Sequence, residues 1–219
     1  GVTGVDLLAE TGSDLPLVRE LGYGRCRLAA AVPSDSPITA VEGLDGVRVA
    51  TAHPNTTRRF FAERRIRVDV IPISGAVEVA PRLGLAEAIV DLVSTGSTLQ
   101  MNGLRPIGDV LASQAILVAN PDAQRERGPD LAGIETMLSA VLAARGRKYL
   151  MMNAPAIKLD ELSALLPGLE SPSVIPLTHQ GMIAIHAVVE ADAVWSLLPR
   201  LKAAGASGIL VLPIEKIVA

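Results

Sequence analysis

The segment best suited to chemistry is a loop of small polar residues, Ser94–Thr98, which follows the apolar run Ala88–Val93 and leads into a helix. Gly96 lets the backbone approach an anion closely, and the amides that follow it can point inward together. Hydroxyl groups add hydrogen-bond donors at four positions: Ser94, Thr95, Ser97 and Thr98. The helix start adds a partial positive charge. The loop is therefore predicted to hold a phosphate monoester; a capped helix start with no ligand is the alternative.

Two further features could serve the same ligand. Asp91 stands just before the loop, where a carboxylate can accept hydrogen bonds from sugar hydroxyl groups. The segment Thr51–Arg59 also leads from a strand end into a helix, which places it on the ligand side of the sheet. In this segment His53 could stack on a base, and Arg58 or Arg59 could meet a phosphate. A solvated basic helix face is the alternative for at least one of the two arginines.

Other candidate residues point to chemistry less directly. Glu78 follows a glycine turn and could enter the same cleft, or it could be an ordinary glutamate in the first turn of a surface helix. His179 and His186 are predicted to be structural, and the lone cysteine, Cys26, to be a small core residue. The sequence shows no metal-ligand spacing, no serine–histidine–aspartate arrangement and no Walker loop.

The composition narrows the class of protein. Of 219 residues, 49% are hydrophobic and 20% charged, and the formal net charge of −3 predicts no nucleic-acid partner. A single cysteine permits no intramolecular disulfide and fits a reducing compartment. No apolar run has the length of a membrane span and no signal peptide is evident, so a cytoplasmic protein without a membrane partner is predicted.

Apolar runs and glycine or proline breaks predict the elements that position these residues. Five runs are predicted as strands: Arg27–Val32, Gly46–Thr51, Val68–Ile73, Ala88–Val93 and Ala115–Ala119. Their continuous apolar character indicates a mainly parallel sheet covered on both faces. Three helices are predicted between them: Asn55–Arg64 with Asn55 as its cap, Ala76–Leu83, and Thr98–Gly103. This alternation indicates an α/β fold.

The rest of the chain predicts a second module. Leu131–Arg145 is amphipathic and is predicted to be a packed helix. Strands are then predicted at Lys148–Met152, Ser173–Leu177, Met182–Val189 and Gly208–Ile214. Helices are predicted at Ile157–Leu166, stopped by Pro167-Gly168, and at Ala191–Ala204, closed by Gly205. The resulting order β-α-β-β-α-β is that of a ferredoxin-like module.

Taken together, these stretches resemble the long form of ATP phosphoribosyltransferase, the first enzyme of histidine biosynthesis. The resemblance extends over essentially the whole chain. The matching stretches are Gly1–Asp6, Thr51–Arg59, Ser74–Leu85, Glu87–Leu99, Asn102–Leu104, Lys148–Pro155, Leu166–Pro172 and Gly205–Ile217. The resemblance implies a transferase that moves the phosphoribosyl group of 5-phosphoribosyl diphosphate (PRPP) to N1 of the ATP adenine, releases pyrophosphate and requires Mg²⁺. It also implies homo-oligomers, from dimer to hexamer.

The resemblance implies the fold as well. The catalytic part would be two-lobed and periplasmic-binding-protein-like (type II), with lobe I formed by residues 1–27 and 119–147 and lobe II by residues 28–118. Residues 148–219 would form a ferredoxin-like βαββαβ regulatory domain that binds histidine as a feedback inhibitor. The family has an N-terminal strand and helix before the position of Gly1. The chain itself opens without methionine on a glycine-rich turn, Gly1–Asp6, as if a strand had just ended, so it is interpreted as a fragment or processed product. A separate chain could supply the family's N-terminal segment.

The resemblance also assigns roles to single residues. Asp91 and Thr98 would be catalytic, and PRPP would contact Glu78, Asp91 and the loop residues Ser94, Thr95, Gly96, Ser97 and Thr98. ATP would contact Asp6 and His53, the latter at a position where the family often has tyrosine. Histidine would bind at Asn153, Ser173 and Gly208. The metal ligands are not assigned.

Two other interpretations compete with a transferase. One is a binding protein without catalysis, either a receptor for a small solute or a regulatory subunit that senses histidine. A receptor usually carries an export signal, and a regulatory subunit would not need the Asp91–Thr98 segment intact. The other is an assembly module whose ferredoxin-like domain serves only oligomer contacts.

Overall fold

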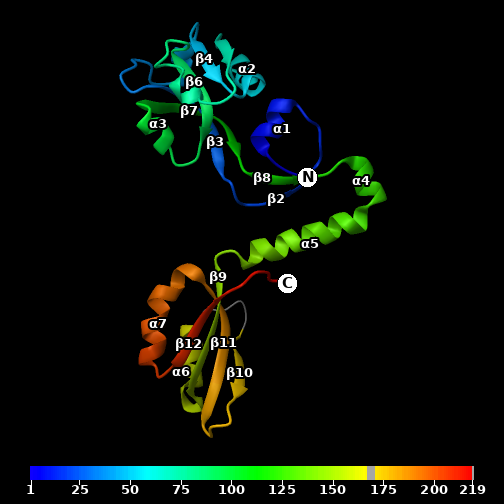
Figure 1. Cartoon of the computed structure of the whole chain (residues 1–219), viewed down its shortest axis with the longest axis vertical. Coiled ribbons are helices and arrows are strands. Elements are labelled where there is room, and N and C mark those ends of the chain that lie inside the picture. Colours follow the sequence, from blue (N-terminus) through cyan, green and yellow to red (C-terminus); the bar gives the residue numbers. More distant parts are fainter. Residues whose placement is uncertain (167–170, 219) are drawn as a thin grey trace. The chain divides into compact units, whose positions relative to one another are not determined.

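The computed structural model describes residues 1–166 and 171–218. Contacts divide the chain into two compact units, Gly1–Gly128 (unit 1) and Pro129–Ala219 (unit 2), which are shown in Figure 1. The predicted helix stop at Pro167-Gly168 lies outside the described residues, as does much of the Leu166–Pro172 stretch.

Unit 1 begins with a small antiparallel sheet of order β1-β8-β2. Its strands are β1 (Val2–Gly4), β8 (Ala115–Val118) and β2 (Leu17–Glu20), and helix α1 (Val5–Thr11) follows β1 directly. The prediction that Gly1–Asp6 is a turn after a strand is therefore wrong. The partner of β1 lies more than a hundred residues later in the chain, where no local pattern could indicate it.

The second sheet of unit 1 has the order β5-β4-β6-β3-β7. Its strands are β3 (Cys26–Pro33), β4 (Arg48–Thr51), β5 (Asp69–Pro72), β6 (Ala88–Val93) and β7 (Leu104–Ser113). Strand β4 pairs in parallel with β5 and β6, as predicted, but β3 runs antiparallel to both β6 and β7. Strand β7 escaped prediction because Pro106 and Gly108 interrupt it, and its pairing with β3 contains two register shifts.

Strand β3 explains why the second sheet has two hydrophobic faces. Its residues alternate between two core clusters: Leu28, Ala30 and Val32 pack with Phe60 and Phe61, whereas Ala29 and Ala31 pack with Ile89, Val93 and Leu99. All five of these β3 side chains are fully buried. A continuous apolar run is what a strand covered on both faces requires, and this part of the α/β prediction is confirmed.

The helices of unit 1 correct several predicted bounds. They are α2 (Pro54–Glu63), α3 (Ser97–Met101) and α4 (Pro121–Glu126), with 3-10 turns η1 (Val41–Leu44) and η2 (Val77–Val79). His53, not Asn55, occupies the cap position of α2, and Pro54 takes the first helical position, which proline favours. The predicted helix Ala76–Leu83 is only the turn η2, because Gly75 and Ala76 both have left-handed backbone angles and Pro81 follows.

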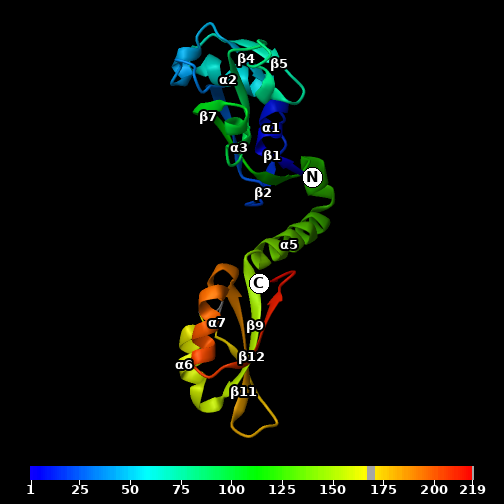
Figure 2. The same ribbon diagram turned by 60° about the vertical axis from the view of Figure 1, so that its left-hand side comes forward.

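Unit 2 confirms the ferredoxin-like prediction. After helix α5 (Gly128–Ala144) it contains β9 (Arg147–Pro155), α6 (Leu159–Leu165), β10 (Ser173–Pro176), β11 (Met182–Glu190), α7 (Val194–Ala203) and β12 (Ser207–Pro213), with short turns η3 (Ala156–Lys158) and η4 (Ala191–Ala193). The antiparallel sheet has the order β10-β11-β9-β12. Both α6 and α7 lie on one face of it, as Figure 2 shows, and contribute to its core cluster.

Helix α5 forms as predicted, but Ile134, Met137 and Val141 on it are about half exposed, so the packed helix face is only partly realised. None of the helices in the described residues has the length and apolar character needed to cross a membrane.

Candidate functional site

The loop between β6 and α3 has the predicted geometry of strand, turn and helix. Gly96 adopts a φ of 85°, a left-handed conformation that glycine accepts without strain, and immediately precedes α3. The hydroxyl-bearing residues Ser94, Thr95, Ser97 and Thr98 are all exposed. The Thr95 and Ser97 hydroxyl oxygens lie 3.0 Å apart, and Asn102 Nδ2 donates to the Thr98 carbonyl at 3.0 Å. The loop is thus ordered by its own hydrogen bonds while its hydroxyl groups stay accessible.

Asp91 lies on β6 at the entrance to this loop and is half-buried. Burial raises the pKa of its carboxyl, and the Glu78 charge raises that pKa further. The Leu92 amide, which donates to Asp91 Oδ1 at 2.8 Å, and the imidazole of His53 act in the opposite direction and lower the same pKa. These effects on Asp91 place Glu78 and His53, which come from two other segments, within electrostatic range of the Asp91 carboxyl.

Asp6 and His53 form a buried pair. Their exposed fractions are only 7% and 6%, and Asp6 Oδ2 lies 3.4 Å from His53 Nε2. The other carboxylate oxygen, Oδ1, accepts from the Ser113 hydroxyl at 2.5 Å, and that hydroxyl accepts from the Asp6 amide at 3.1 Å. The His53 amide donates to Thr51 Oγ1 at 2.9 Å, so both members of the pair are anchored on more than one side.

The pair belongs to a larger polar cluster. Within the described residues, the buried polar and charged side chains are Asp6, Thr51, His53, Thr56, Thr57 and Ser113. All six lie in unit 1, and four of them belong to or flank the start of α2. His53 Nδ1 and Thr56 Oγ1 are buried without a hydrogen-bond partner within the protein. Because an unsatisfied buried polar atom is costly, these two atoms mark a place where a ligand or water can complete the cluster.

Helix α1 also fixes the start of α2. The Glu10 carboxylate accepts from the amides of Asn55 at 2.9 Å and Thr56 at 2.8 Å, so it caps the helix as an acidic group at a helix N-terminus should. Arg59 donates to the Ala9 carbonyl at 3.0 Å. Arg59, one of the two arginines considered for a phosphate, is thus engaged with α1, and the two helices hold His53 beside Asp6.

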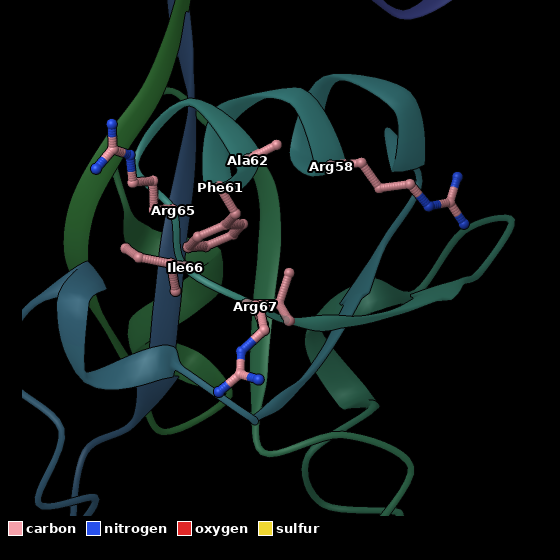
Figure 3. Close-up of a pocket in the computed structure, with 7 residues that line it drawn as sticks. Arg58, Phe61, Ala62, Arg65, Ile66 and Arg67 are labelled. Carbon is pink, nitrogen blue, oxygen red and sulfur yellow. The ribbon is translucent and has the colours of Figure 1, made fainter.

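A surface pocket at the other end of α2 is no part of this site. Its lining residues are Arg58, Phe61, Ala62, Arg65, Ile66, Arg67 and Val68. In Figure 3 the guanidinium groups of its three arginines point away from one another, and Arg67 pairs with Asp45 at 3.4 Å. Three guanidinium groups that point away from one another cannot bind one anion together, so the arginines of this pocket do not form a phosphate site.

The residues assigned to histidine binding lie on the sheet of unit 2. Asn153 on β9 and Gly208 on β12 are close: Asn153 Nδ2 lies 3.4 Å from the position of a Cβ on Gly208, whose φ is 57°. Ser173 lies on the edge strand β10, separated from β9 by β11. His186 on β11 hydrogen-bonds the Tyr149 hydroxyl at 2.9 Å through Nδ1. The structure therefore brings Asn153 and Gly208 together and leaves Ser173 two strands away.

No group of three or more potential metal ligands forms among residues 1–166 and 171–218. Carboxylates do come together in unit 1, where the Glu78 charge acts on Asp91. One or two carboxylates beside a substrate phosphate are the usual protein contribution to a Mg²⁺ site, so the residues present fit a metal that arrives with a phosphorylated ligand.

Comparison with protein families gives two matches that together cover most of the chain. Residues 1–142 match the model of the family described as ATP phosphoribosyltransferase. Residues 144–216 match the model described as the HisG C-terminal domain. The division between the two matches falls at the end of α5, just before the sheet of unit 2 begins.

Curated relatives and one solved structure support the same family assignment. The ATP phosphoribosyltransferase of Methanococcoides burtonii is 43% identical over the whole chain, which spans 77% of that relative. The enzyme of the same name from Gemmatimonas aurantiaca is 45% identical, again over the whole chain and 78% of the relative. A structure of the HisG:HisZ ATP phosphoribosyltransferase complex from Thermotoga maritima matches with a TM-score of 0.56 and 28% identity, covering 62% of this chain and 65% of that one.

Proposed function

Because this chain belongs to the ATP phosphoribosyltransferase family, we propose that the loop Ser94–Thr98 and the Asp6–His53 pair are two halves of one active site. The reaction transfers the phosphoribosyl group of PRPP to N1 of ATP and releases pyrophosphate in histidine biosynthesis. The observation that carries the proposal is the electrostatic link of Asp91 with both Glu78 and His53, which joins the loop to the buried pair.

The loop supplies the PRPP half of the site. Its exposed hydroxyl groups and the amides that follow Gly96 can surround the 5′-phosphate, with Thr98 in the first turn of α3. Asp91 and Glu78 face the ribose, where carboxylates accept hydrogen bonds from sugar hydroxyl groups. The partly desolvated Asp91 also lies where the ribose ring becomes positively charged as the bond to pyrophosphate breaks, and its negative charge favours that transition state.

The buried pair supplies the ATP half. The imidazole of His53 is proposed to contact the adenine, and Asp6 holds that ring through Nε2. His53 Nδ1 and Thr56 Oγ1, which have no partner within the protein, are the polar atoms that a bound nucleotide or its water would satisfy.

Catalysis in this site rests on orientation. Adenine N1 is a neutral nucleophile that attacks the anomeric carbon of PRPP, so a bond from N1 to that carbon forms while the bond to the pyrophosphate oxygen breaks. No proton must leave N1, so no general base is required, and holding the two substrates in line supplies most of the acceleration. When bound, Mg²⁺ stabilises the charge of the pyrophosphate, and Glu78 and Asp91 are the carboxylates available to hold it.

Unit 2 is the proposed regulatory domain. Asn153 and Gly208 on adjacent strands, with Ser173 on the edge strand, form the side of the sheet proposed to bind histidine as a feedback inhibitor. The amide side chain of Asn153 can hydrogen-bond the carboxylate or the amino group of an amino acid, and the lack of a side chain at Gly208 leaves room beside it. In the chain as a whole, residues 1–27 with 119–147 and residues 28–118 are the proposed catalytic lobes, and residues 148–219 the regulatory domain.

The proposed setting follows from the substrates. ATP and PRPP are metabolites of the cytoplasm, which is the proposed location, and the chain is proposed to assemble as a homo-oligomer, from dimer to hexamer. The Thermotoga maritima structure is of a complex of two kinds of chain, so association with a separate chain is also compatible with this family.

Turnover of the full chain with ATP, PRPP and Mg²⁺, followed by the ultraviolet absorbance of the product, tests the active-site proposal. Thr98→Ala should lower kcat/KM by roughly a hundredfold, the usual cost of misplacing a reacting group. Thr136→Ala on α5 is the matched control, because it removes another exposed threonine hydroxyl, one that donates to the Ala132 carbonyl. Equal activity of the Thr98→Ala and Thr136→Ala variants would contradict the proposed role of the loop.

A further inference from the structure

The Ser113 hydroxyl makes two hydrogen bonds, both to Asp6. Its hydroxyl accepts from the Asp6 amide at 3.1 Å and donates to Asp6 Oδ1 at 2.5 Å. Ser113 ends β7 and Asp6 lies in the first turn of α1, so the contact joins elements 107 residues apart in sequence. Both residues are buried, and a hydrogen bond to a carboxylate shielded from water is stronger than one at the surface.

Gly4, the last residue of β1, lies against the same carboxylate. A Cβ at this position would lie only 2.2 Å from Asp6 Oδ1, far inside van der Waals contact. The backbone at Gly4 is extended, with φ −91° and ψ 150°, so any residue could adopt its conformation. A side chain at this position would therefore displace the Asp6 carboxylate, although the backbone itself would accept one.

The two contacts determine which carboxylate oxygen faces the imidazole. With Oδ1 held by the Ser113 hydroxyl and enclosed by Gly4, Oδ2 is the oxygen that lies 3.4 Å from His53 Nε2. We propose that Ser113 and Gly4 are positioning residues for ATP, which act by fixing the Asp6 carboxylate against the His53 ring. This inference rests on the proposed function, in which Asp6 and His53 contact the nucleotide.

Calorimetric titration of the full chain with ATP, and separately with PRPP and Mg²⁺, tests this inference. Ser113→Ala removes both hydrogen bonds and should weaken ATP affinity about tenfold, since a hydrogen bond to a charged group is worth about that factor. PRPP affinity should not change, because the loop Ser94–Thr98 is untouched. Thr11→Ala is the control. It removes a hydroxyl that donates to the Leu7 carbonyl within α1, the helix that also contains Asp6, and it should leave both affinities unchanged.

Gly4→Ala provides a second route to the same displacement. Its methyl group would push Asp6 Oδ1 away while leaving the Ser113 hydroxyl in place, so it should also weaken ATP binding and spare PRPP binding. If Ser113→Ala does not fold, Gly4→Ala decides the question. Equal losses for ATP and PRPP would overturn the inference, because they would indicate general damage to unit 1.

The Asp6→Asn background separates this inference from the proposed function. If Ser113 acts through the Asp6 carboxylate, Ser113→Ala should cost much less ATP affinity in the Asp6→Asn protein than in the wild type. A full tenfold loss in both backgrounds would overturn the positioning role alone. If Asp6→Asn and His53→Ala themselves leave ATP affinity unchanged, the proposed ATP half of the site is wrong, and the inference falls with it.

Discussion

The two units of the chain differ in where they place polar side chains. In the described residues every buried polar or charged side chain lies in unit 1, around the start of α2. The core cluster of unit 2 is apolar throughout, from Leu150 and Met152 on β9 to Leu197 and Leu201 on α7. In the sheet of unit 2, Asn153 is exposed, and the pair of Tyr149 and His186 is only partly buried.

This difference indicates how each unit works. Burying polar groups costs stability unless they are hydrogen-bonded, so a folded unit retains them where it must hold side chains in fixed positions. Unit 1 does so through the chain of contacts Ser113–Asp6–His53–Thr51. In unit 2 the buried face of the sheet forms an apolar core with residues of α6 and α7, such as Leu162 and Leu201.

The strongest test of this contrast is a cavity in the core of unit 2. Leu150 is fully buried at the centre of that core, so Leu150→Ala should destabilise unit 2 by about 2–5 kcal/mol. ATP and PRPP should bind with unchanged affinity, because the residues proposed to contact them lie in unit 1. Thermal unfolding and titration of the same variant measure both effects. A matching loss of ATP affinity would mean that the two units do not divide their roles as proposed.

A second test addresses the loop of unit 1. Gly96→Val forces a β-branched residue into a backbone with φ 85°, at a cost of about 1–2 kcal/mol or a shift of the loop. A shifted loop should lower turnover by roughly a hundredfold. The space at this position is open, the nearest atom being Val93 Cγ1 at 4.0 Å from a Cβ, so a clash would not explain the loss. Steady-state kinetics would contradict the account if kcat/KM stayed within a few-fold of wild type.

Asp91 provides a pH test. Its pKa is raised in the folded protein above its ordinary value of 3.8, mainly by burial, so folding favours the protonated form. The free energy of unfolding therefore falls as the pH rises from 3.8 through the pKa that Asp91 has in the folded protein. Below pH 3.8 Asp91 causes no such fall, because it is protonated in both the folded and the unfolded state.

Asp91→Asn should accordingly stabilise unit 1 near neutral pH and lose that advantage as the pH approaches 3.8. Its side-chain oxygen can still accept from the Leu92 amide, so that contact is preserved. Denaturant unfolding of both proteins across this pH range measures the difference. A variant that is less stable than wild type at neutral pH would show that the desolvation of Asp91 is compensated within the folded protein.

The smallest expected effect lies in the sheet of unit 2. Tyr149→Phe removes the hydroxyl that hydrogen-bonds His186 Nδ1, which should cost about 1 kcal/mol of stability. Neither substrate should bind differently. The change in the unfolding midpoint, measured against His186→Gln, would reveal whether this pair has a larger role than a single partly buried hydrogen bond.

The sequence predicts the elements whose patterns are local. The apolar runs at β3, β4, β6 and β8 are long enough to identify the strands, and the order of elements identifies the ferredoxin-like unit. Strand β1 and helix α1 could not be predicted, because β1 is stabilised by pairing with a strand at the far end of unit 1. Strand β7 was missed for a related reason, since proline and glycine interrupt it.

The residues of the candidate site likewise include some that the sequence indicates and some that it does not. The loop Ser94–Thr98, Asp91 and His53 carry a local signal, whereas Asp6 was assigned only through resemblance to a family. Ser113 carries no signal at all: it is a serine at the end of an unpredicted strand, and its importance depends on a contact across 107 residues. Glu10 is similar, because only the docking of α1 beside α2 makes it a cap.

Hydrogen exchange of the full chain, with ATP alone and with PRPP and Mg²⁺ alone, tests most directly whether unit 1 holds both halves of one site. PRPP should slow exchange in residues 91–101, which contain the loop and α3, and ATP should slow it in residues 4–7 and 53–57, which contain Asp6 and the start of α2. Protection confined to unit 2, or the same protection by both ligands in only one of these segments, would contradict the two-part site.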